Sequence, residues 1–108
     1  MRILFVENHA TLAELVVARF LAAHIVEIVP SLAAARARLA TPYDAILVDY
    51  DLDDGKGDVL VRELRAAGTT AKLVGISARD AGNEALVAAG VDAVCPKLEL
   101  ARIGDVLG

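Results

Sequence analysis

Short apolar runs, each bounded by polar residues, recur along this chain and constrain its fold more than any other feature. They occupy residues 2–6, 25–29, 45–48, 72–76 and 91–95. Most of their positions are apolar without alternation, which indicates strands buried on both faces, as parallel sheets require. Stretches with helical periodicity separate the runs. The sequence therefore predicts five βα units and an α/β fold with one parallel sheet.

Local signals indicate where the intervening helices begin and end. Side chains that commonly cap helix N-termini occur at Ser31, Asp58 and Asp80, and glycines that commonly follow a helix occur at Gly68 and Gly90. A last short helix is expected after residue 97, with an apolar side that consists of Leu98, Leu100, Ile103 and Leu107.

Composition limits the classes of protein to which the chain can belong. Its 108 residues, 56% of them hydrophobic, fit one domain over residues 1–108 with its own core and no output domain. The 11 basic residues are scattered among 15 acidic ones, so no cationic stripe for nucleic acid is expected. The first apolar run is too short for a signal peptide, and no run approaches the ~20 residues of a membrane span. We expect a cytoplasmic protein without membrane contact.

Polar side chains follow four of the five apolar runs. Glu7 and Asn8 follow the first run, Asp49 follows the third, Ser77 follows the fourth and Lys97 lies just behind the last. The carboxyl ends of parallel strands meet at one edge of a sheet, so these side chains should converge on a single pocket. A charge such as Asp49 at the end of a buried strand must be partnered or functional. Cys95, the lone cysteine, is expected to be a small buried hydrophobe.

The segment after the third run is rich in acids and permits several interpretations. A solvated turn accounts well for Asp53 and Asp54. A calcium loop of the EF-hand type is excluded, because Asp54 stands at its glycine position and Leu60 at its bidentate glutamate position. The pair Asp49 and Asp51 is also similar to the nucleophile strand of haloacid-dehalogenase-type phosphatases. Those chains are normally much longer, so a small phosphatase-like hydrolase is a distant third hypothesis.

Taken together, the motifs resemble the receiver domain of two-component response regulators over essentially the whole chain. Residues 3–8 are similar to the first strand and acidic pair of that family, and Asp49 matches its phosphoacceptor aspartate. Residues 76–78 match a strand that ends in Thr or Ser, and residues 90–93 lead to Lys97 at the place of the family's lysine. The resemblance implies a flavodoxin-like, doubly wound (βα)5 sandwich with a five-stranded parallel sheet in the order 2-1-3-4-5.

The resemblance also implies a function in signalling rather than an enzyme activity. Asp49 would accept a phosphoryl group from a histidine kinase or phosphotransfer protein, and Ser77 and Lys97 would bind that group. The chain would then act on an unknown downstream protein by protein–protein interaction. The sequence does not identify the kinase, the downstream protein or the oligomeric state.

A magnesium ion is implied as well, held by Glu7, Asn8, Asp49 and the backbone carbonyl of Asp51. The cation would neutralise charge on the transferring group. Asn8 stands where the family has the acid that binds the metal directly, so the site loses one negative charge. Because divalent affinity follows ligand charge, we expect weak binding of Mg²⁺.

Three departures from the family pattern favour a second hypothesis, a pseudo-receiver that binds partners without phosphorylation. They are Asn8, Val94 at a position that is commonly aromatic, and Leu98 where proline usually follows the lysine. The intact residues Asp49, Ser77 and Lys97 oppose this hypothesis.

Asp51 and Arg79 occupy two variable positions that flank the phosphorylation site in receivers and influence how long the phosphate survives. They either form an ion pair over the pocket mouth or remain exposed charges with little coupling. The sequence leaves both open.

Overall fold

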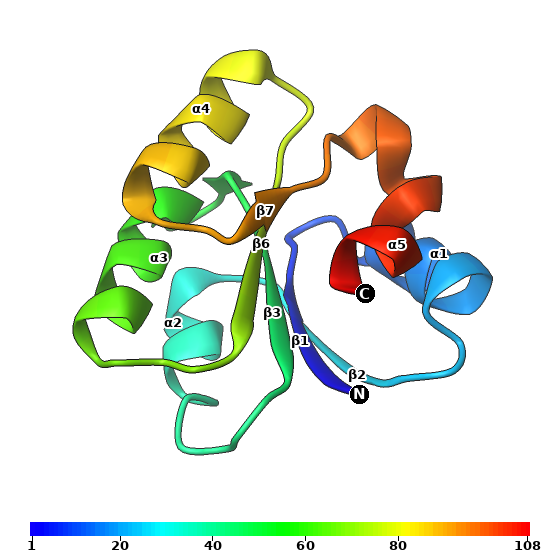
Figure 1. Cartoon of the computed structure of the whole chain (residues 1–108), viewed down its shortest axis with the longest axis horizontal. Helices are drawn as coiled ribbons and strands as arrows, with labels where there is room; N and C mark the ends of the chain where they lie inside the picture. Colours follow the sequence, from blue (N-terminus) through cyan, green and yellow to red (C-terminus); the bar gives the residue numbers. More distant parts are fainter.

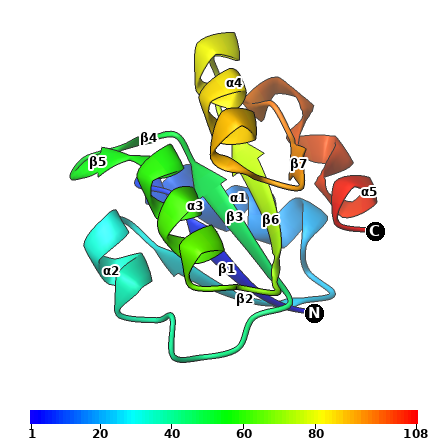
Figure 2. The ribbon, with the colours of Figure 1, turned by 60° about the vertical axis from the view of Figure 1, so that its left-hand side comes forward.

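A five-stranded parallel sheet forms the middle layer of the computed structural model, which describes residues 1–108 (Figure 1). In spatial order its strands are β2 (Ile25–Val29), β1 (Arg2–Val6), β3 (Ala45–Asp49), β6 (Lys72–Ile76) and β7 (Ala93–Val94). Counting only the strands of this sheet, the order is 2-1-3-4-5, which confirms the predicted doubly wound topology. A separate antiparallel hairpin, β4 (Asp51–Leu52) with β5 (Gly55–Lys56), projects beyond β3 (Figure 2).

Helices cover both faces of the sheet. One face is covered by α1 (Ala10–Phe20), the 3-10 helix η1 (Lys97–Arg102) and α5 (Ile103–Leu107). The other face is covered by α2 (Leu32–Arg36), α3 (Gly57–Ala66) and α4 (Asp80–Ala89). No helix combines the length and the apolar character that crossing a membrane requires.

The central strands divide their side chains between two separate cores. In β1, Ile3 and Phe5 pack under α1 and α5, whereas Leu4 and Val6 pack under α2 and α3. Every residue of β3 is buried. Because each face is covered, both sets of alternating side chains must be apolar, which is the physical reason for the continuous apolar runs.

The helix ends agree with the sequence signals at some positions and differ at others. The Ser31 hydroxyl accepts a hydrogen bond from the backbone of Ala34 and caps α2, as predicted, and Gly90 ends α4 in a left-handed conformation with φ of 112°. Asp58 and Asp80 do not cap their helices, because the N-cap positions belong to Lys56 and Arg79. Both acids instead lie in the first turn, where the helix dipole still favours a negative charge.

The C-terminal part differs most from the sequence prediction. The expected strand over 91–95 contracts to β7, and the expected last helix divides into η1 and α5. Glu99 adopts non-helical backbone angles within η1, and Leu98 is 96% exposed rather than part of the apolar side. The other three predicted apolar residues, Leu100, Ile103 and Leu107, are buried.

Gly57 joins the hairpin to α3 and packs directly on the end of β3. A methyl group added there would collide with the backbone carbonyl oxygen of Asp49 and lie 2.9 Å from a methyl group of Val48. We therefore predict that Gly57→Ala destabilises the protein by about 1–3 kcal/mol, the usual cost of overpacking. Gly104→Ala is the matched control, because an added methyl group meets nothing within 4 Å in α5. Urea denaturation of both variants measures the difference, and equal stabilities would show that Gly57 is not tightly packed.

Candidate functional site

Lys97 connects two buried carboxylates that lie at the ends of neighbouring strands. Its ammonium nitrogen is 2.8 Å from Oε1 of Glu7 and 3.3 Å from Oδ1 of Asp49. Glu7 is 1% exposed and Asp49 is 2% exposed. Because β1 and β3 are adjacent and parallel, their carboxyl ends bring the two acids to one place. The structure therefore unites three of the residues that the sequence predicts for the site.

The backbone beyond β7 delivers Lys97 to this place. The backbone amide of Cys95 donates a hydrogen bond to the carbonyl oxygen of Gly75. The backbone amide of Lys97 donates one of 3.0 Å to the carbonyl oxygen of Ser77. The chain thus continues to run beside β6 after β7 ends. This backbone pairing turns the lysine side chain toward the acids and sets its position next to Ser77.

Ser77 lies in the same corner, but its hydroxyl group is turned toward the start of α4. Its side-chain oxygen accepts a hydrogen bond of 3.1 Å from the backbone amide of Arg79. Gly82 leaves room for it, because a methyl group added at Gly82 would collide with the Ser77 oxygen and lie 3.0 Å from the Tyr50 ring. Ser77 is therefore buried against α4 and not hydrogen-bonded to the acids.

The charges of the site do not balance. Burial, followed by the hydrogen bond and negative charge of Glu7, raises the pKa of Asp49 to about 7, although Lys97 partly opposes this rise. Burial acts to lower the pKa of Lys97, but the hydrogen bond and charge of Glu7 together with Asp49 outweigh it and raise that pKa. Two carboxylates with one ammonium group leave one uncompensated negative charge. The site therefore favours either a proton or an additional cation.

Three buried oxygen atoms of this region lack any hydrogen-bond partner. They are Oε2 of Glu7, Oδ1 of Asn8 and Oδ2 of Asp49. Buried polar atoms are almost always paired, so orphaned oxygens at the ends of adjacent strands need an explanation. Carboxylate and amide oxygens are the ligands that Mg²⁺ prefers in proteins. These three atoms fit a divalent cation.

The structure contains no group of three or more His, Cys, Asp or Glu side chains arranged to hold a metal. The three unpartnered oxygens belong to two carboxylates and one amide, because residue 8 is an asparagine. The set is consistent with the expectation that Mg²⁺ binds weakly. The assignment of Glu7, Asn8, Asp49 and the Asp51 carbonyl as ligands remains a prediction.

Asp51 and Arg79 form an ion pair, as one interpretation of the sequence expected, between side chains that remain about half exposed. The Arg79 guanidinium lies 2.8 Å from one carboxylate oxygen of Asp51, and the Lys56 ammonium approaches the same oxygen to 2.6 Å. Both cations lie against the Tyr50 ring, at 5.3 Å for Lys56 and 5.6 Å for Arg79. The hydrogen bond from Lys56, followed by that from Arg79, lowers the pKa of Asp51.

Asp53 and Asp54 form the exposed turn of the hairpin, as predicted, but both also accept hydrogen bonds from distant segments. Asp54 accepts hydrogen bonds from the backbone amides of Leu32 and Ala33 at 2.9 and 3.0 Å, and these bonds lower its pKa. Asp53 accepts a hydrogen bond of 3.1 Å from the side-chain nitrogen of Asn8. The partners are 21 or more positions away in sequence, so no local signal could have revealed them.

Comparison with solved structures identifies the architecture. Neither a scan of protein-family models nor a search of curated proteins finds a match to the sequence. By structure, the chain is similar to the receiver domain of a Pseudomonas aeruginosa sensor histidine kinase, described with magnesium in its active-site cleft. That similarity has 26% identity, a TM-score of 0.84, and coverage of 98% of this chain and 93% of that one.

Two further solved structures are similar in fold at lower sequence identity. The receiver domain of a Francisella response regulator has 18% identity and a TM-score of 0.83, covering 98% of this chain and 94% of its own. A receiver domain protein from Methanospirillum hungatei has 20% identity and a TM-score of 0.81, and the match covers 98% of this chain and 92% of that one. The chain has the fold of a response-regulator receiver domain.

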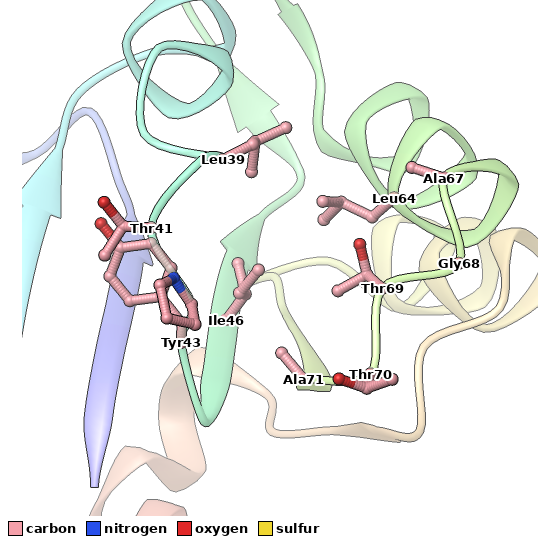
Figure 3. Close-up of a pocket in the computed structure, with 11 residues that line it drawn as sticks. Leu39, Thr41, Tyr43, Ile46, Leu64, Ala67, Gly68, Thr69, Thr70 and Ala71 are labelled. Carbon is pink, nitrogen blue, oxygen red and sulfur yellow. The ribbon is translucent and has the colours of Figure 1, made fainter.

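One cavity of this fold lies at the opposite edge of the sheet (Figure 3). It has a volume of about 310 Å³ and is bordered by the segments that precede β3 and β6, with Thr41 on one side and Thr69 on the other. Its lining contains no acidic or basic side chain. The cavity therefore lacks the groups for phosphoryl chemistry, and the carboxyl edge of the sheet remains the candidate site.

The raised pKa of Asp49 predicts how the stability of the protein depends on pH. Between about pH 4, where an unfolded aspartate titrates, and about pH 7, where Asp49 titrates in the folded protein, the unfolded state binds fewer protons. The contribution of this group to stability therefore falls as the pH rises. Asp49→Asn removes the buried charge and should stabilise the protein by about 1–3 kcal/mol at pH 8 in the presence of chelator.

At pH 4 the difference between Asp49→Asn and the wild type should largely vanish, because both side chains are then neutral in the folded protein. Thermal unfolding of both proteins across this pH range tests the prediction. A variant that is less stable than the wild type at pH 8 would show that Asp49 is held as a net favourable ion pair.

Proposed function

We propose that the chain is a phosphoacceptor receiver in which Asp49 takes a phosphoryl group from a histidine kinase or phosphotransfer protein. The observation that carries this proposal is the single ammonium group of Lys97 between the buried carboxylates of Glu7 and Asp49. The buried, unpartnered oxygens of Glu7, Asn8 and Asp49 support a divalent cation as a further part of the site. A nucleophile, a fixed positive charge and a cation site are the parts that phosphoryl transfer to a carboxylate requires.

In the proposed reaction, a carboxylate oxygen of Asp49 attacks the phosphorus atom of a phosphohistidine. The new O–P bond forms as the P–N bond breaks, and the imidazole nitrogen keeps the electron pair of the broken bond. Lys97 lies 3.3 Å from Asp49 and contacts the phosphoryl oxygens as they arrive. A divalent cation held by Glu7, Asn8, Asp49 and the Asp51 carbonyl would supply further positive charge to those oxygens.

The proposed output begins at Ser77. Its hydroxyl group now accepts from the amide of Arg79, the N-cap residue of α4, and it would turn to donate to the new phosphate. Because this releases a hydrogen bond at the start of α4, the helix can shift and alter the surface that it forms with β7. Val94 offers no aromatic rotamer to couple to this movement, so the signal must pass through the backbone and the helix to a downstream protein.

Phosphorylation of the purified protein tests this proposal. Incubation with acetyl phosphate and Mg²⁺ should add one phosphate to the intact mass, and Asp49→Asn should abolish the addition. Asp105→Asn, which removes an exposed acid on α5, is the matched control and should be labelled like the wild type. Circular dichroism shows whether each variant is folded.

The competing function is a pseudo-receiver that binds its partner without phosphorylation. The departures at Asn8, Val94 and Leu98 favour it, and the apolar side chain of Leu98 is 96% exposed. An unchanged mass at high concentrations of donor and Mg²⁺ would decide for the pseudo-receiver.

A further inference from the structure

The side chain of Asn8 has two ends with different surroundings. Its nitrogen donates a hydrogen bond of 3.1 Å to Oδ1 of Asp53, at the exposed turn of the β4–β5 hairpin. Its oxygen is buried and has no hydrogen-bond partner. A carboxylate accepts hydrogen bonds but cannot donate them, so Asp53 selects the nitrogen of the amide and turns the oxygen away.

The Asn8 oxygen is one of three buried oxygens in this region that lack a hydrogen-bond partner. Glu7 and Asp49 each keep one buried carboxylate oxygen without a partner, at the ends of the adjacent strands β1 and β3. The opposite orientation of the Asn8 amide would put its nitrogen in the buried position that the oxygen now holds, and it would set the amide oxygen against the carboxylate oxygen of Asp53. The hydrogen bond to Asp53 therefore determines whether position 8 contributes an oxygen to this set.

Asp53 is itself held in place by the rest of the hairpin. Asp54, the next residue, is bonded to the first two residues of α2, and Asp51 is bonded to Arg79 and Lys56. The hairpin is thus fixed to α2 on one side and to the start of α4 on the other. Asp53 is presented to Asn8 from a supported position rather than from a free loop.

We propose that Asp53 is a positioning residue for the divalent cation site, a role that rests on the proposed phosphoacceptor function. Asp53 fixes the Asn8 amide so that the amide oxygen faces the site. It also brings a negative charge next to Asn8, which itself carries none. Groups that orient metal ligands typically change metal affinity 10- to 100-fold when removed. Because Asp53 is exposed and screened by solvent, we expect an effect of about 3- to 10-fold.

Two substitutions separate orientation from charge. Asp53→Ala removes both the hydrogen bond and the charge, and it should weaken Mg²⁺ binding about 3- to 10-fold. Asp53→Asn keeps an oxygen that can accept from Asn8 but loses the charge, and it should weaken binding by less. Asp105→Asn, which removes the same charge from α5, should leave the affinity unchanged. Calorimetric titration with MgCl₂ measures each affinity without any phosphodonor.

The effect of Asp53 should reverse when Asn8 is replaced by aspartate. In Asn8→Asp the hydrogen bond is lost and two carboxylates face each other, so Asp53 becomes unfavourable in the absence of metal. Adding Asp53→Ala to Asn8→Asp should then raise the melting temperature in chelator, whereas Asp53→Ala alone should lower it. The four proteins form a double-mutant cycle whose coupling does not depend on metal.

These measurements distinguish the failure of this inference from the failure of the proposed function. Mg²⁺ affinities that do not change with Asp53→Ala, or melting temperatures that are additive in the cycle, would overturn the role of Asp53 while leaving phosphorylation of Asp49 possible. A wild-type protein that binds no Mg²⁺ would overturn the role of Asp53 and remove the cation from the proposed reaction. Reversal in chelator together with weaker Mg²⁺ binding by Asp53→Ala would support the inference.

Discussion

The ammonium group of Lys97, placed between the buried carboxylates of Glu7 and Asp49, is the interaction on which the chemistry of this molecule depends. Two negative charges at the ends of adjacent strands are costly to bury, and one lysine offsets only part of that cost. The remaining charge raises the pKa of Asp49 to about 7. Without a further cation, the fold keeps its proposed nucleophile in a partly protonated and destabilising state, and binding of a cation would remove that imbalance.

The hairpin after β3 shows how closely spaced acids acquire separate roles from their partners. Asp49 faces the buried site, Asp51 pairs with Arg79 and Lys56, Asp53 orients Asn8, and Asp54 binds the start of α2. These contacts fix one short segment to three parts of the domain. A change at the site can therefore reach α2 and α4 through hydrogen bonds that already exist.

The sheet and the central cluster could be predicted from the sequence, because burial on both faces and strand-end polarity leave direct patterns. The runs predicted the strands, and Glu7, Asp49 and Lys97 lie together as expected. The partners of Asp53 and Asp54 could not be predicted, since they depend on how the hairpin meets distant segments. Leu98 was misplaced because helical periodicity does not reveal the break at Glu99. The N-caps were missed by one or two residues, as Asp58 and Asp80 lie inside the first turn.

The titration of the Asp49 carboxyl group, followed by carbon NMR, tests the central claim most directly. In chelator the account predicts a pKa near 7 for this carboxyl group, well above that of an ordinary aspartate. Saturating Mg²⁺ should lower that pKa, and Lys97→Met should raise it in chelator, because each changes the positive charge beside the two acids. A pKa near 4 that responds to neither Mg²⁺ nor the loss of Lys97 would contradict the account.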